Sequence, residues 1–197
     1  MHFREKSLAT RDIFKASILL LASLFFVNTS WADKDKGVYV GAGINFVNVG
    51  VLDPFANEVN FKTGDLFVGY KYNPYLGVEL RYGASLQDET ISVEDENGFD
   101  SSVTATISEY TSVYYRPELS NEIAKLYLLL GQTSLKTSLE IDSDVSTIET
   151  AESGLSYGFG FGLWLDEKMN LNFEYKVLVT TSADSFTGTT LNADYRF

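Results

Sequence analysis

The sequence predicts an all-β fold, an eight-stranded antiparallel up-and-down transmembrane β-barrel. From Gly37 onward, segments of about ten residues alternate apolar and polar side chains with a period of two. No stretch in this part shows the 3.6-residue apolar spacing of an amphipathic helix. The connections between the segments alternate between short and long, and the chain ends on such a segment with Phe197 as its last residue.

The first 32 residues predict an export signal that is not part of the fold. A basic stretch from Arg4 to Lys15 precedes an apolar run of 12 residues at 16–27, and Ser30-Trp31-Ala32 has the small-x-small pattern that signal peptidases cleave. The run is shorter than the roughly 20 residues of a transmembrane helix, which disfavours the alternative of an uncleaved anchor. We therefore expect a cleaved signal peptide at 1–32 and one barrel domain at 33–197.

Charge and composition exclude several classes of chemistry. The net charge is -12, whereas binding to a nucleic-acid duplex needs a basic surface, so we expect no nucleic-acid partner. The chain has no Cys, and its single His, His2, lies in the predicted signal peptide. A histidine base, a histidine metal ligand or a cysteine nucleophile is then missing from the mature chain. We expect no catalytic residue, no metal site and no bound cofactor.

The first four segments show the alternation with one irregularity. They lie at about 38–46, 65–72, 76–84 and 103–116, and the first places Val38 and Val40 on an apolar face with Tyr39 on the other. In the fourth segment Glu109 and Arg116 occupy an odd and an even position, which places them on opposite faces of a regular strand. A β-bulge would reconcile them, so the register of this strand stays open.

The last four segments lie at about 124–131, 155–165, 171–179 and 191–197. Their apolar faces include Leu128, Phe159, Val177 and Val179, which we expect to contact lipid. On the opposite face, the alternating glycines at 158–162 predict room for neighbouring bulky side chains rather than a phosphate-binding loop, because no helix follows them.

The lengths of the connections separate a membrane barrel from a soluble one, which alternation alone cannot do. Short connections are expected at Asn73-Pro74, at about 117–122 and at 166–168, and long ones at about 48–60, 87–102, 138–153 and 181–188. Outer-membrane barrels have short periplasmic turns, longer external loops and an even number of strands. An open sheet is excluded in lipid because its edge N–H and C=O groups would have no partner.

Three segments carry a family resemblance: 191–197 (LNADYRF), 73–82 (NPYLGVELRY) and 124–127 (AKLY). The mature chain resembles the small eight-stranded outer-membrane β-barrel proteins of Gram-negative bacteria, of the OmpX/Ail and OmpA-barrel type. This resemblance implies a location in the cell outer membrane, in contact with its lipid. It also implies insertion by the barrel-assembly machinery, with Tyr195 and Phe197 as the assembly signal. Members serve as structural proteins, adhesins or lipid enzymes, so it implies no single activity. We expect a monomer.

Charged residues on the polar faces predict an ion network in the lumen. An eight-stranded barrel is just wide enough for side chains to fill it, so we expect these residues to pair with one another. A gated ion path through the same charges is the alternative. Five basic and four acidic residues make up the predicted network: Lys71, Arg81, Lys125, Lys176 and Arg196 with Asp65, Glu79, Glu174 and Asp194.

The four long connections carry 14 acidic residues and no Lys or Arg. We interpret them as a solvated acidic fringe, and contact with a cationic partner or loosely bound divalent ions stays open. Neither Asp142-x-Asp144 nor the run at 95–98 has the full spacing of an EF-hand loop.

Together these features favour a non-enzymatic barrel with a structural or surface-interaction role. The alternatives are an outer-membrane enzyme acting on lipid or peptide, and a narrow pore. The enzyme is disfavoured because barrel enzymes of this size generally use a histidine, and the mature chain has none.

Overall fold

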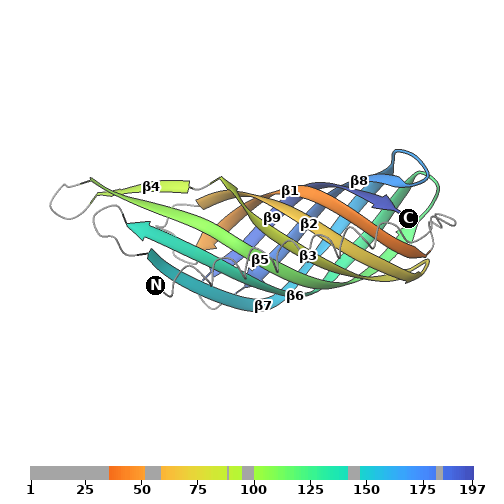
Figure 1. Cartoon of the computed structure of the whole chain (residues 1–197), viewed down its shortest axis with the longest axis horizontal. Helices are drawn as coiled ribbons and strands as arrows, with labels where there is room; N and C mark the ends of the chain where they lie inside the picture. Colours follow the sequence, from red (N-terminus) through yellow and green to blue (C-terminus); the bar gives the residue numbers. More distant parts are fainter. Residues whose placement is uncertain (1–35, 52–58, 88, 95–99, 142–146, 181–183) are drawn as a thin grey trace, which may run out of the picture. The chain divides into compact units, whose positions relative to one another are not determined.

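The computed structural model describes residues 36–51, 59–87, 89–94, 100–141, 147–180 and 184–197. The predicted signal peptide lies outside the described residues. The described residues form nine strands (Figure 1): β1 (Gly37–Val51), β2 (Val59–Asn73), β3 (Leu76–Gln87), β4 (Glu89–Glu94), β5 (Asp100–Ser120), β6 (Ala124–Ile141), β7 (Thr147–Trp164), β8 (Met169–Thr180) and β9 (Asp184–Arg196).

The strands close into an antiparallel barrel with eight positions in its wall. Neighbouring strands follow the order β3-β2-β1-β9-β8-β7-β6-β5, and β3 also pairs with β5, which closes the ring. β4 continues along the edge of β5 where β3 ends, so β3 and β4 share one position. The predicted eight-stranded barrel is confirmed, although one of its strands is split in two. In the described residues no helix is long and apolar enough to cross a membrane.

Asn and Asp side chains shape the short connections. The Asn73 carboxamide oxygen accepts from the Tyr75 N–H at 2.8 Å, Asn121 accepts from the N–H groups of Ile123 and Ala124, and Asp166 accepts from those of Lys168 and Met169. These are the local bonds that favour tight turns. The second turn is shorter than expected, because residues 117–120 belong to β5.

The long connections are largely strand, which differs from the prediction of long loops. β1 continues to Val51, β6 to Ile141, and β7 begins at Thr147. The β1 extension pairs with β2 and β9, and the extensions of β6 and β7 pair with each other, so most of their backbone N–H and C=O groups have partners without any contribution from lipid. Segments such as 147–150 are also rich in Thr and Ile, which favour strands.

Two register shifts change which residues face inward. In β5 the shift falls between Ile107 and Glu109, so a bulge exists but lies before Glu109. Glu109 is therefore half-exposed while Arg116 is buried, so the two side chains do lie on opposite faces of the strand.

A second shift lies in β8, between Val177 and Val179. It turns Val179 into the barrel, so the expected lipid contact of Val179 is wrong. Val177 is only 8% exposed, which makes it a poor lipid contact as well. Leu128 and Phe159 are 48% and 60% exposed on the outer wall, as predicted.

Candidate functional site

Three layers of side chains fill the lumen. Ionised residues occupy the end near the short connections, where Tyr39 of β1 lies opposite Arg196 of β9. Uncharged polar residues follow, and apolar residues fill the opposite end, where Val49 lies opposite Phe186. The middle layer is closed by hydrogen bonds such as Ser112–Thr133 at 2.7 Å, and it contains Asn45, Thr63, Ser112, Thr133, Ser156 and Thr190.

Arg81 is the centre of the ionised layer. Its guanidinium donates two bonds to Glu174, at 2.6 and 2.7 Å, and its Nε donates to Glu79. Asp65 lies 3.5 Å away and also pairs with Lys176 at 3.4 Å. A planar guanidinium suits such multiple carboxylate contacts, and the fully buried pair needs them to offset the loss of water.

A second centre forms around Glu118. Its carboxylate pairs with Lys71 and Arg196 at 2.9 Å each and lies 3.5 Å from Arg116. Arg116 also donates to Glu79 at 2.5 Å, which links the two centres. Separately, Lys125 donates to Asp194 at 2.7 Å.

All nine residues of the predicted network are buried in the lumen and belong to these ion pairs. The prediction missed Arg116 and Glu118, which lie on the strand whose register was open. The even-numbered residues from Tyr110 to Glu118 form one buried face of β5. The alternating tyrosines Tyr110 and Tyr114 are the sequence signal that could have identified this face. With both added, the described residues bury six cations and five carboxylates.

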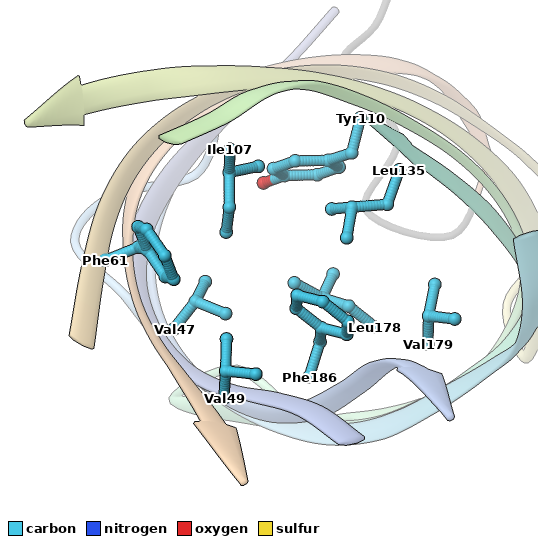
Figure 2. Packing of buried hydrophobic residues seen from close by; sticks show 9 residues of the cluster. All are labelled: Val47, Val49, Phe61, Ile107, Tyr110, Leu135, Leu178, Val179 and Phe186. Carbon is cyan, nitrogen blue, oxygen red and sulfur yellow. The ribbon is translucent and has the colours of Figure 1, made fainter. Parts of the chain in front are cut away.

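An apolar plug seals the other end of the lumen. Figure 2 shows its side chains pointing into the barrel from the surrounding strands. The two register shifts contribute to it: the shift in β8 lets the neighbouring Leu178 and Val179 both face inward, and the shift in β5 brings both Ile107 and Tyr110 to the inner face. This layer was not predicted from the sequence. Its members are Val47, Val49, Phe61, Ile107, Tyr110, Leu135, Leu178, Val179 and Phe186.

Glycines give the large lumen side chains their space. A Cβ on Gly160 would lie 2.2 Å from the ring of Tyr127, and one on Gly83 would lie 2.3 Å from the ring of Tyr110. Both distances are far below van der Waals contact, so each tyrosine ring occupies space that only a glycine leaves open. The prediction that the glycines at 158–162 make room for lumen residues is confirmed at Gly160.

The C-terminal aromatic residues lie at the rim of the barrel that carries the short connections. The rings of Tyr195 and Phe197 meet edge to face, with centroids 5.1 Å apart, and the Phe197 N–H donates to the Val38 carbonyl at 3.1 Å. Tyr195 is exposed on the outer wall and Phe197 is half-buried.

A four-stranded sheet projects beyond the apolar band of the barrel. We call it the protruding sheet, and it consists of β4 with residues 100–107 of β5, 137–141 of β6 and 147–153 of β7. On the outer face of β7, Phe159, Tyr157 and Leu155 give way to Ser153, Ala151 and Glu149. Figure 1 shows β4 at the end of the barrel opposite the C-terminus.

One edge of the protruding sheet is unpaired among the described strands. The Trp164 N–H donates to Ile123, just before β6, whereas the Leu165 N–H donates to Met169 of β8. The β6–β7 register is unbroken, so odd-numbered residues of β7 direct their N–H and C=O groups away from β6. Pairing with β8 ends at Tyr157, so among the described strands the odd-numbered residues from 149 to 153 have no neighbour on that side.

The surroundings of this edge are acidic. The sequence from 137 to 167 contains no Lys or Arg, Glu149 is exposed and Glu152 is half-buried. Lys136 of β6 is already paired with Glu109 at 2.5 Å. The described residues contain no group of three or more potential ligands arranged for a metal ion. Asp142, Asp144 and the run at 95–98 lie outside the described residues.

Comparison with known proteins places these features in a family. The family model for the outer membrane protein beta-barrel domain matches residues 17–197. No curated protein matches the chain.

Solved structures with the same fold are distant in sequence. Ail, the attachment invasion locus protein of Yersinia pestis, is 19% identical with a TM-score of 0.59, over 83% of this chain and 99% of that chain. Neisserial surface protein A is 14% identical with a TM-score of 0.57, over 82% and 97%. The N-terminal barrel domain of Pseudomonas aeruginosa OprF is 12% identical with a TM-score of 0.51, over 80% and 97%. At these identities the likeness concerns the fold. The chain belongs to the outer membrane protein beta-barrel family and is a protein of the cell outer membrane.

Proposed function

We propose that the protein is a surface-interaction barrel that binds an extended segment of a partner along the unpaired edge of β7. The unpaired edge is the observation that carries this proposal. N–H and C=O groups in a row are a template for another strand, and main-chain hydrogen bonds to such an edge supply affinity.

The charge of the protruding sheet favours a basic partner segment. An added strand places its side chains about 5 Å from those of β7, close enough for opposite charges to pair. Glu149 faces outward, and Lys136, the basic residue that interacts with it, is already paired with Glu109. Ail has been solved in complex with a heparin analogue, which is a polyanion. The acidic edge of this chain disfavours such a ligand and favours a Lys- or Arg-rich strand.

The lumen supports an interaction role over catalysis or conduction. Each of its eleven buried ionised side chains takes part in an ion pair, and the apolar plug covers the external end. A filled eight-stranded barrel of this kind is a rigid support for the protruding sheet.

Ala151→Pro tests the proposal. The Ala151 N–H faces the unpaired edge, so proline removes one donor there without removing a bond to β6. The probe is a fluorescent ten-residue peptide of alternating Lys and Thr, and its anisotropy is measured with the barrel in zwitterionic detergent micelles. We expect Ala151→Pro to weaken binding at least tenfold.

Two controls make the result specific. Ala151→Val keeps the N–H and should bind like the wild type, whereas a peptide of alternating Glu and Thr should not bind. Equal affinity of the basic peptide for the Pro and Val variants would show that charge alone attracts it, and would overturn strand addition.

A further inference from the structure

The wall of the barrel has a gap in its hydrogen-bond ladder at Pro117. The Glu118 N–H donates to the Tyr75 carbonyl at 2.7 Å, so the neighbouring Pro117 directs its backbone toward β6. The register places Leu128 opposite, because Tyr115 pairs with Leu130 and Glu118 with Tyr127. Proline has no N–H to donate. The pairing of β5 with β6 is interrupted here and resumes on both sides.

A groove of about 530 Å³ lies at this gap. Tyr127 and Gly160 line what we call its floor, Glu118 also lines it, and its other side chains are almost all apolar. The Tyr127 floor is held in place from inside, because its hydroxyl donates to Glu174 at 2.6 Å and Arg116 lies 3.8 Å above its ring. The wall side chains are Leu76, Pro117, Leu119, Leu126, Leu128 and Phe159.

The position of the groove identifies what can enter it. Leu119, Leu126 and Phe159 belong to the outward apolar band, which lies in hydrocarbon in a membrane barrel. Tyr75, in the short turn between β2 and β3, lines one end of the groove and is strongly exposed. Tyrosines at this level mark the membrane interface. The groove therefore opens toward the periplasmic leaflet, where acyl chains are the apolar material present.

We propose that the groove at Pro117 is a lipid site that holds one acyl chain of a phospholipid from the periplasmic leaflet. The chain packs against the leucines and Phe159 and covers the ladder gap, where water is absent. The site is independent of the protruding sheet and of the proposed function. A lipid held in this groove would stay bound, whereas the lipids around the rest of the outer wall exchange freely.

Native mass spectrometry of the folded barrel, extracted from membranes in mild detergent, tests the site. We expect one retained phospholipid per wild-type barrel. Leu128→Trp should fill the groove and lower the retained fraction at least fivefold. Leu80→Trp is the matched control, because Leu80 lies on the outer wall with 47% exposure against 48% for Leu128 and does not line the groove.

Pro117→Val gives a second arm. It restores the missing donor opposite Leu128, so it should keep the barrel folded and also lower lipid retention. A wild-type barrel without phospholipid, or equal retention in the Leu128→Trp and Leu80→Trp variants, would overturn the proposal. Retention of lipopolysaccharide in place of phospholipid would overturn the assignment to the periplasmic leaflet.

Discussion

At the scale of single residues, Arg81 shows how a lumen can hold charges without water. It contacts three carboxylates, those of Glu79, Glu174 and Asp65, and the Tyr127 hydroxyl donates a further bond to Glu174. Its guanidinium also lies 4.7 Å from the ring of Phe67. Such an arrangement compensates for burial only when every partner is present.

Arg81→Met should therefore destabilise the barrel strongly. The change leaves buried carboxylates uncompensated, and the expected loss in the free energy of unfolding is about 3–5 kcal/mol. Lys136→Met is the control, because the Lys136–Glu109 pair is exposed to solvent and should contribute little to stability. Guanidinium titration of both variants in micelles measures the difference. Equal losses would mean that the buried network is not what stabilises the lumen.

At the scale of elements, β9 joins the two ends of the chain in the barrel wall by pairing with both β1 and β8. Its end is anchored by the Phe197 N–H bond to Val38 and by the edge-to-face contact of Phe197 with Tyr195. These contacts are few compared with the long ladders on either side. The role of the terminal aromatic residues as an assembly signal stays a prediction.

Deletion of Phe197 separates assembly from stability. We expect the amount of barrel inserted in cells to fall much more than the stability of the same variant refolded in detergent, because the packing lost is small. The inserted fraction is measured by membrane fractionation and by the gel mobility of unboiled against boiled samples. Proportionate losses in both assays would assign Phe197 a packing role alone.

At the scale of the whole molecule, the three lumen layers predict a closed barrel. Ions would have to cross the apolar plug, the middle layer of uncharged polar residues and the layer of paired charges one after another. We expect no stepwise current in planar bilayers from the wild-type protein. Leu178→Ala should lower stability by about 2–5 kcal/mol by leaving a cavity, yet still pass no current, because the layers below stay closed. Stepwise conductance of the wild type would favour a narrow pore.

Local periodicity was sufficient to predict the barrel, its eight positions, the inward faces of six strands and that of β8 as far as Lys176. Alternation with a period of two can be read from neighbouring residues alone. It also fixes which face points inward, because slipping a strand by one residue would turn its whole apolar face from lipid into the lumen. The nine predicted lumen charges follow from the same parity. Arg116 and Glu118 were missed because the parity of β5 changes at its bulge.

Only the tertiary structure decided which charges pair, where the plug lies and which edge is unpaired. Arg81 and Glu174 are 93 residues apart in sequence, and their contact depends on strand stagger and closure of the ring. The bulges in β5 and β8 depend on the neighbouring strands: Glu109 and Arg116 indicated an irregularity in β5 without giving its position, and no sequence pattern marked the one in β8. Likewise, the unpaired edge of β7 exists because β8 ends at Thr180 whereas β6 continues to Ile141. The relative lengths of neighbouring strands cannot be predicted from the alternation within one strand.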